Sequence, residues 1–347
     1  MEIPVRGILM KKSLFGLMIP AIALFLISCG GSGGSGSSGG GGGAPSPNNA
    51  PGCDTTQDPS CSVLMVTQSD GTIATRYYVL YIPANFPASS GSLVVALHGT
   101  GDSALDYASR TLMNTTADAD GFAVAYAEAV DAPRNGNLRQ WNFYFNGAAS
   151  PTDSSPDDVS FLRQLITTLQ PTLNADPKKI YVMGSSAGGL MAVRAGVELS
   201  DLVAAIGVLS GALDIQEGSN EVVPAAAGPV SVLMLHADMD TTIPYCGDSS
   251  NASQDATFNY WVAADATPNL DTATPLCSNG NPTAVNEKDA TGGLSNTEVK
   301  FYRLIGAVHM TELFDADLSP YNPNFNATTG ILSNDIVWNF LAAHPKP

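Results

Sequence analysis

Short apolar runs alternate with helical patterns from residue 62 almost to the end of this 347-residue chain. Several runs are unbroken, as in strands buried on both faces of a parallel sheet. After two opening strands near Ser62–Met65 and Tyr77–Ile82, the alternation predicts an α/β sheet covered by helices on both faces. The other predicted strands are Leu93–Leu97, Phe122–Ala127, Ile180–Met183, Ala205–Leu209, Val230–Leu235 and Val299–Ile305, and the predicted helices are Ala104–Ala117, Asp157–Leu169, Ala187–Leu199, Ala256–Ala264 and Asp335–Ala343, the last capped by Ser333.

Residues 1–28 are predicted to be a bacterial lipoprotein signal peptide. Lys11 and Lys12 precede an apolar run that ends in Leu26-Ile27-Ser28-Cys29, and the run is short for a ~30 Å hydrocarbon core. Cys29 would become the acylated N-terminus and hold the exported protein on a membrane, facing the periplasm or the cell exterior. An uncleaved anchor helix is the alternative.

Composition divides the remainder into a tether and one domain. Residues 29–52 are rich in Gly, Ser and Pro without charge, which predicts a flexible linker with a reach of about 25 Å. Residues 53–347 then form a single domain, expected to be monomeric. The chain has 15 Lys and Arg against 32 Asp and Glu, a net charge of −17. This balance excludes nucleic acid as a partner, and membrane attachment would depend on the lipid alone.

Four cysteines remain besides Cys29, an even number in a chain expected to be exported, where disulfides persist. Three connectivities are possible. We favour Cys53–Cys61 and Cys246–Cys277 because the members of each pair lie near each other in the sequence. No spacing typical of a zinc site occurs, so no metal is expected.

Ser186 is the candidate nucleophile. It lies in Gly184-Ser185-Ser186-Ala187-Gly188, which fits G-x-S-x-G, follows an apolar strand and opens a helix, the context of a nucleophile elbow. The linker also contains G-x-S-x-G matches, but these have no strand before them or helix after them. A plain strand-to-helix turn capped by serine is the alternative.

A serine nucleophile needs a base, and in folds with such an elbow the base follows the last strand. His309 follows Ile305 in a loop, whereas His344 ends the terminal helix and is expected to face solvent. His309 is therefore the predicted base. The orienting carboxylate should follow the strand before that one, where Asp238 and Asp240 compete.

The stretch His236–Tyr245 resembles the H-G-x-x-D-x-x-V-P-Y segment of exported α/β-hydrolase esterases, the group of polyhydroxybutyrate depolymerases and feruloyl or acetylxylan esterases. Ala237 and Ile243 replace the glycine and valine of that pattern. The resemblance implies an α/β-hydrolase fold with a mostly parallel central sheet. It makes Asp240 the acid, with Asp238 second, and leaves His236 a structural role. It also covers Leu97-His98-Gly99, Gly121–Tyr126, Trp141-Asn142 and Asp157–Leu162.

The resemblance further implies an oxyanion hole. Backbone N–H groups of Thr100 and Ala187 would converge on the developing negative oxygen, and His98 would support this loop. Trp141 and Tyr245 are candidate pocket aromatics, with packing under a loop as the alternative.

The expected activity is that of a lipid-anchored serine carboxylic ester hydrolase that uses no cofactor. The expected substrates are feruloyl or acetyl esters of plant polysaccharide, with polyhydroxybutyrate or another aliphatic polyester as the alternative. The His309 loop lacks the Trp and Pro that relatives often carry. The substrates of the family are therefore a weaker guide to the substrate of this chain. A serine peptidase of similar fold and a non-catalytic binding lipoprotein are the rival interpretations.

Overall fold

The computed structural model describes residues 52–53, 60–132, 138–145, 156–214, 223–270, 274–309, 317–318, 320–322 and 332–347. The predicted signal peptide, the lipidation at Cys29 and all of the predicted linker except Gly52 lie outside these ranges. Every described residue belongs to one compact unit, residues 45–347.

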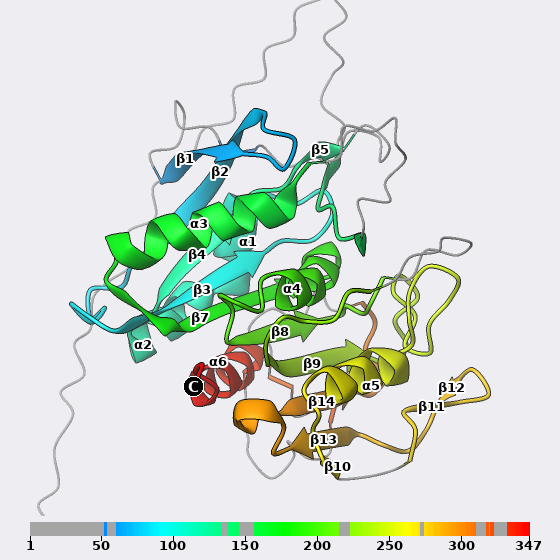
Figure 1. Cartoon of the computed structure of the whole chain (residues 1–347). Coiled ribbons are helices and arrows are strands. Elements are labelled where there is room, and N and C mark those ends of the chain that lie inside the picture. The colour runs from blue at the N-terminus through cyan, green and yellow to red at the C-terminus, as the bar shows by residue number, and fades with distance from the viewer. Residues whose placement is uncertain are drawn as a thin grey trace, which may run out of the picture. The chain divides into compact units, whose positions relative to one another are not determined.

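A mostly parallel sheet of ten described strands forms the centre of this unit (Figure 1), in the order β1-β2-β4-β3-β7-β8-β9-β14-β13-β10. The six strands from β4 to β14 pair in parallel, and antiparallel strands extend both edges. The strands are β1 (Cys61–Thr67), β2 (Ile73–Tyr81), β3 (Gly91–Leu97), β4 (Ala123–Ala127), β7 (Ala175–Ser185), β8 (Ala205–Leu209), β9 (Ser231–Ala237), β10 (Asn269–Leu270), β13 (Glu287–Thr291) and β14 (Val299–Leu304), with small hairpins β5 (Val130–Ala132) with β6 (Leu138–Gln140) and β11 (Cys277–Ser278) with β12 (Asn281–Pro282).

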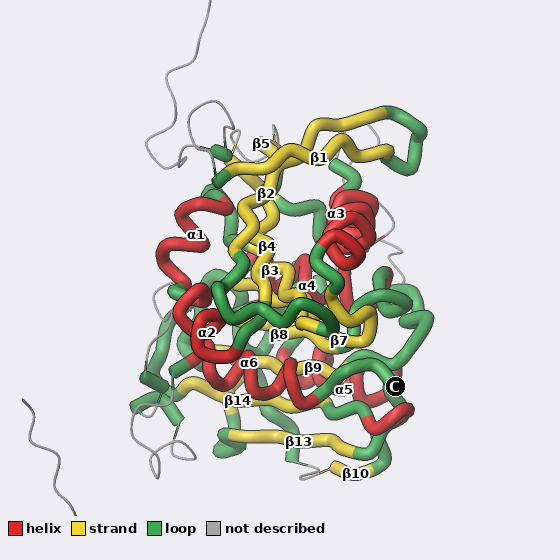
Figure 2. The backbone as a smooth tube through the Cα atoms, turned by 90° about the vertical axis from the view of Figure 1, so that its left-hand side faces the viewer, coloured by secondary structure: helices red, strands yellow, loops and turns green. Residues whose placement is uncertain are grey.

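Helices cover both faces of the sheet, as Figures 1 and 2 show. α3, α4 and α5 lie on one face, and α1, α2 and α6 lie on the other. Among the described residues, no helix is long and apolar enough to span a membrane. The helices are α1 (Ala104–Thr111), α2 (Met113–Asp120), α3 (Asp158–Thr172), α4 (Ala187–Glu198), α5 (Gln254–Ala264) and α6 (Ser333–Ala343), with a short 3₁₀ turn at Leu294–Asn296.

The alternation of side chains along β3 supplies both layers of the core. Leu93, Val95 and Leu97 belong to the apolar cluster under α3, α4 and α5, while Val94 and Ala96 belong to the cluster under α1, α2 and α6. Because successive side chains of a strand point to opposite faces, a central strand covered twice must be apolar throughout. The predicted α/β-hydrolase fold is thus confirmed in its layers and its mostly parallel sheet.

Two local predictions were wrong, and one strand of the central sheet was missed. The predicted helix Ala104–Ala117 is two helices, because Leu112 adopts a left-handed φ of 53° between them. Ser333 lies inside the first turn of α6, whose N-cap position is Leu332 with no side-chain capping bond. β13 was not predicted, because its sequence Glu-Lys-Asp-Ala-Thr is polar and lacks an apolar run.

A buried carboxyl at the end of α5 makes stability depend on pH. Asp265 is completely buried, and its Oδ1 accepts the backbone N–H of Val230 at 3.0 Å. Burial raises the pKa of Asp265 to about 7. An unfolded aspartate titrates near ~3.9, so the folded state holds its proton more tightly and stability falls as the pH rises from about 4 to about 7.

The Asp265→Asn variant, which cannot ionise, should gain stability relative to the native protein as the pH rises. We expect its advantage to grow by about 2–3 kcal/mol between pH ~5 and pH ~8, measured as the unfolding free energy in urea at both pH values. The exposed Asp201→Asn variant is the control and should show no such trend. An Asp265→Asn difference that is equal at both pH values would exclude the buried charge as the cause.

Candidate active site

Ser186 occupies a sharp turn between β7 and α4. Its backbone has φ 56° and ψ −124°, a conformation that costs a non-glycine residue energy and persists only where the surroundings impose it. The Ser186 N–H donates to the Leu209 carbonyl of β8 at 3.0 Å, which ties the turn to the neighbouring strand. This strained strand-to-helix turn is the predicted nucleophile elbow.

Two glycines allow the elbow to form. A Cβ at Gly184 would lie 2.2 Å from the Gly188 carbonyl oxygen, and a Cβ at Gly188 would lie 2.1 Å from the Leu97 carbonyl oxygen. Both distances are far below van der Waals contact, and each opposing atom is backbone that cannot rotate away. The G-x-S-x-G spacing is therefore a requirement of close packing between β7, α4 and β3.

His309 joins Ser186 to Asp240. Its Nε2 lies 2.8 Å from Ser186 Oγ, and its Nδ1 lies 2.6 Å from Asp240 Oδ2. His309 follows β14 and Asp240 follows β9, so the three side chains meet at the carboxyl edge of neighbouring parallel strands. In the tautomer that satisfies both contacts, Nδ1–H donates to the carboxylate and Nε2 accepts from the serine hydroxyl.

The surroundings of Asp240 favour its ionised form. Burial opposes its charge, but the hydrogen bond from His309, the backbone N–H of Ile243 and the nearby His236 outweigh that effect and hold the pKa of Asp240 below its ordinary value. Its Oδ1 accepts the N–H groups of Thr242 at 2.8 Å and Ile243 at 2.9 Å, which leaves Oδ2 for His309. The competing candidate Asp238 instead accepts hydrogen bonds from Arg303 and from the backbone N–H of Gly306.

The predicted oxyanion loop lies against the candidate nucleophile. A Cβ at Gly99 would be 3.9 Å from Ser186 Oγ, so the backbone that leads to Thr100 is close to the serine. Ala187, the first residue of α4, is the other predicted donor. His98 supports this loop, because its Nε2 accepts the Ala129 N–H at 3.0 Å. Burial lowers the pKa of His98 to about 4, which keeps its ring neutral.

The hairpin β5–β6 also supports the Thr100 loop, a role that was not predicted from the sequence. The Thr100 side chain donates to Gln140, and the Gly101 N–H donates to the Arg139 carbonyl at 2.8 Å. The Arg139 guanidinium is paired with the buried Glu128 at 2.9 Å. A three-residue polar strand leaves no periodic signal that could have indicated this role.

The two candidate pocket aromatics are core residues in the structure. Trp141 has no exposed surface, and its indole N–H donates to the His98 carbonyl at 2.8 Å beneath the oxyanion loop. Tyr245 is 2% exposed and packs edge-on against His236 and Phe301. Both match the alternative of packing under a loop, because neither presents a surface to a ligand here.

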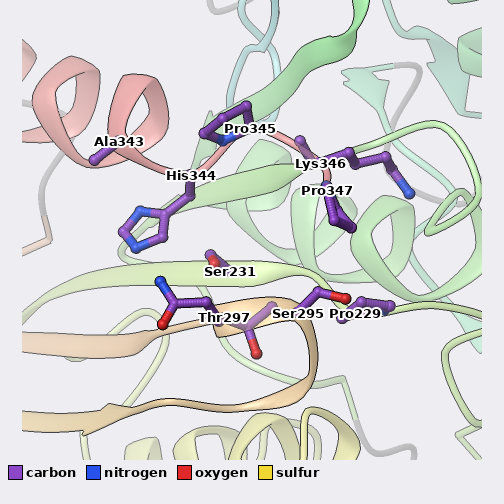
Figure 3. Close-up of a pocket in the computed structure, with 11 residues that line it drawn as sticks. Pro229, Ser231, Ser295, Thr297, Ala343, His344, Pro345, Lys346 and Pro347 are labelled. Carbon is purple, nitrogen blue, oxygen red and sulfur yellow. The ribbon is translucent and has the colours of Figure 1, made fainter.

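His344 does not face solvent as predicted. Its side chain is 12% exposed, and Nε2 lies 3.2 Å from Glu298 Oε2. It borders a pocket of about 260 Å³ together with Ser231, Thr297 and Lys346 (Figure 3). Because Ser231 begins β9 and Thr297 precedes β14, this pocket lies at the amino edge of the sheet, away from the candidate triad.

Within the described ranges, no three His, Cys, Asp or Glu side chains gather as a metal site requires.

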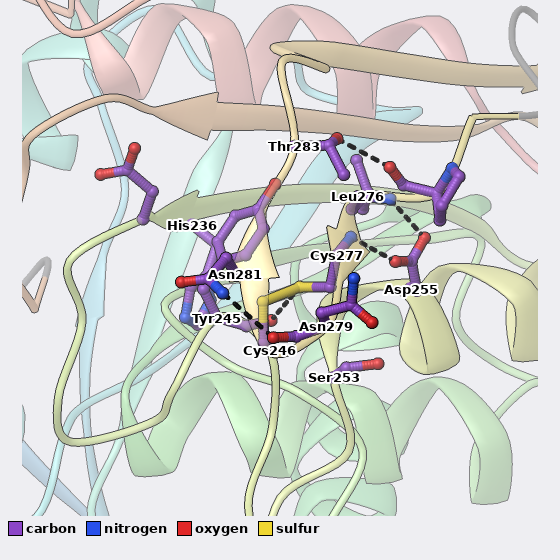
Figure 4. Close-up of a disulfide and its surroundings, with 12 residues drawn as sticks. His236, Tyr245, Cys246, Ser253, Asp255, Leu276, Cys277, Asn279, Asn281 and Thr283 are labelled. Atoms are coloured by element: carbon purple, nitrogen blue, oxygen red, sulfur yellow. Dashed lines mark hydrogen bonds between the residues drawn. A yellow bond between two sulfur atoms is a disulfide. The ribbon is translucent and has the colours of Figure 1, made fainter.

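Both favoured disulfides are present, Cys53–Cys61 and Cys246–Cys277. The second fixes the chain that follows the acid (Figure 4), because Cys246 lies six residues after Asp240. On the other side of the bridge, Asp255 of α5 accepts the N–H groups of Leu276 at 2.7 Å and Cys277 at 2.6 Å. The loop from Asp240 to Cys246 is thus connected to α5 through the disulfide.

Opening the Cys246–Cys277 bridge should lower both stability and activity. The bridge spans 31 residues, for which the chain-entropy model gives about 3–4 kcal/mol. We expect a lower melting temperature and a reduced rate of ester cleavage for the Cys246→Ser/Cys277→Ser variant. Its matched control is Cys53→Ser/Cys61→Ser at β1, which should lose stability but keep its activity. Equal activity losses in the two double variants would contradict a specific effect on the acid loop.

Comparison with known proteins agrees with this geometry. A family model described as Esterase PHB depolymerase matches residues 76–225. The predicted resemblance is confirmed. The match includes the candidate nucleophile Ser186 and the Thr100 loop, and it ends before the candidate acid Asp240 and the candidate base His309.

Individual relatives are also esterases. The protein named "Putative esterase NocK" of Nocardia uniformis subsp. tsuyamanensis is 34% identical over 51% of this chain and 48% of its own length. Feruloyl esterase B of Piromyces equi is 28% identical over 52% of this chain and 32% of its own length. The chain therefore spans about half or less of these relatives. The solved acetyl xylan esterase from Aspergillus awamori, 16% identical, superposes with a TM-score of 0.51 over 82% of this chain and 99% of its own, which supports the fold alone.

Proposed function

We propose that this protein is a serine carboxylic ester hydrolase that acts through Ser186, His309 and Asp240. One observation carries the proposal: an unbroken line of hydrogen bonds, 2.8 Å and 2.6 Å long, from the hydroxyl of a strained elbow serine through an imidazole to a buried carboxylate. Esterase relatives and the esterase family match support the same activity.

The proposed reaction proceeds in two halves. His309 Nε2 takes the proton of Ser186 as Oγ attacks the ester carbonyl, and Asp240 stabilises the resulting imidazolium. The N–H groups of Thr100 and Ala187 receive the negative oxygen of the tetrahedral intermediate. The imidazolium then protonates the departing alcohol, and a water activated by the same imidazole releases the acid from the acyl-enzyme. The proposed steps need only groups of this chain, the ester and water, so the proposal involves no cofactor.

The proposed substrates are feruloyl or acetyl esters of plant polysaccharide. The names of the relatives support this class, since they include feruloyl and acetylxylan esterases. Aliphatic polyester is the second candidate because the matching family is described by polyhydroxybutyrate depolymerase activity.

We further propose that the protein is exported and anchored to a membrane through acylated Cys29. Metabolic labelling with a fatty acid would test this, with a Cys29→Ser variant as the control.

A substrate panel with the detergent-solubilised full-length protein tests the proposed function. Methyl ferulate, acetylated xylan, dispersed polyhydroxybutyrate, a p-nitrophenyl ester and a peptide anilide would be compared at equal enzyme concentration. We expect release of ferulate or acetate and no cleavage of the anilide. Solubilisation of the polyester alone would move the substrate to the second candidate. Cleavage of the anilide alone, or of nothing in the panel, would reject the esterase proposal.

A further inference from the structure

The loops that carry the acid and the base remain joined beyond the end of the sheet. β9 and β14 pair in parallel with Leu304 opposite Ala237. After this point the Asp238 N–H donates to the Leu304 carbonyl, and the Met239 N–H donates to the Ala307 carbonyl, both at 3.1 Å. Two backbone hydrogen bonds therefore connect the segments that lead to Asp240 and His309.

The carboxylate of Asp238 binds both parts of the base segment. Its Oδ2 accepts two N–H groups of Arg303, from Nε at 2.9 Å and from Nη2 at 2.6 Å. Its Oδ1 accepts the N–H of Gly306 at 2.7 Å. Gly306 turns the chain with a left-handed φ of 72°, three residues before His309. One side chain on the acid loop thus fixes the turn from which the base projects.

Arg303 is held as firmly as its partner. Its third nitrogen, Nη1, donates to the Thr283 carbonyl, and the side chains of Arg303 and Asp238 are 14% and 7% exposed. Charge-assisted hydrogen bonds are short and directional, and removing one partner of a largely buried pair leaves the other charge uncompensated. In the part of the chain that the structure describes, the hydrogen bonds of the Asp238 and Arg303 side chains go to each other, to Thr283 and to Gly306, and none goes to Ser186.

We propose that Asp238 and Arg303 are positioning residues that set the separation of Asp240 and His309. This inference rests on the proposed function, because it assigns them to the same triad. Asp238 lies two residues before the acid, and its carboxylate holds the turn three residues before the base. Loss of the pair would let the two loops separate, and displacement of a catalytic group by ~1 Å can cost on the order of 10²-fold in rate.

The Asp238→Asn and Arg303→Lys variants test this role, with Asp158→Asn as the matched control. Asp158 also forms a buried pair with an arginine, Arg76, at 2.6 Å and accepts a backbone N–H, that of Asn142, but it lies on α3. We expect kcat to fall by ~10–100-fold in both test variants with KM unchanged within about twofold. Asp158→Asn should lower the melting temperature by a similar amount and keep its kcat.

A spectroscopic measurement separates this inference from the proposed function. The proton between His309 Nδ1 and Asp240 should give a far-downfield ¹H NMR signal in the native protein whether or not a substrate has been found. We expect that signal to shift upfield or broaden in Asp238→Asn and Arg303→Lys and to stay in place in Asp158→Asn. An unchanged signal and kcat in folded Asp238→Asn and Arg303→Lys protein would overturn the positioning role. A native protein that shows the signal but cleaves no ester would instead reject the proposed function.

Discussion

Replacing Ser186 with alanine should lower turnover of a simple ester by ~10⁶-fold, the size of loss seen when a triad nucleophile is removed. The substitution deletes only the Oγ that lies 2.8 Å from His309 Nε2. Alanine has a Cβ like serine, so it adds no steric conflict at the φ of 56°, and the fold should persist. The measurement is kcat for p-nitrophenyl acetate, with far-UV circular dichroism as the check on folding.

Ser185→Ala is the matched control because it removes the same atom from the adjacent residue. Ser185 ends β7 and is buried, with Tyr107 rather than His309 as its side-chain neighbour. Its activity should stay within a few-fold of the native value. If Ser186→Ala retained more than a few per cent of the activity, the nucleophile would have to be another group.

Replacing Asp240 with asparagine should lower kcat by ~10⁴-fold, as it does in other serine triads. The structure determines how the new amide would lie. Because the N–H groups of Thr242 and Ile243 both require an acceptor at Oδ1, the amide oxygen should take that place and the NH₂ group should face His309. The imidazole would then accept at Nδ1 and carry its proton on Nε2, where it cannot take the proton of Ser186.

The size ranking of two variants checks the assignment of the acid. Asp240→Asn should be far more damaging than Asp238→Asn, and its loss should appear in kcat with little change in KM. The protonation state of His309 can be followed by ¹⁵N NMR, which should show the proton moved from Nδ1 to Nε2 in Asp240→Asn. The reverse ranking of the two losses would make Asp238 the orienting carboxylate.

Local patterns predicted the core of the fold and pointed to Ser186 and His309, whereas the choice of Asp240 over Asp238 came from the resemblance to the esterase group. Unbroken apolar runs such as Leu93–Leu97 indicate strands covered on both faces, and the glycines around Ser186 mark a turn that permits no side chains. The order of His309 after the last parallel strand then follows from topology. These features share one property: each is encoded by neighbouring residues.

Features that depend on distant contacts could not be predicted in the same way. The left-handed turn at Leu112 has no glycine or proline to announce it, and β13 pairs through its backbone while its side chains are polar. The burial of Trp141 beneath His98 is decided by a contact 43 residues away. The ion pair between Asp238 and Arg303 likewise joins residues 65 positions apart.

The distance along the chain between Ser186 and His309, 123 residues, has a consequence for folding kinetics. The hydrogen bond between them can form only after β8, β9 and β14 have added in parallel beside β7. Contacts between such remote segments are slow to form because the intervening chain must first be closed into loops. Helices would return early after dilution from denaturant, whereas the competent triad would be among the last features to appear. The rate at which catalytic activity recovers would therefore report the rate at which the sheet is completed. Before that point, the chain would have much of its secondary structure but an unpaired strand edge beyond β7, which a protease could cleave.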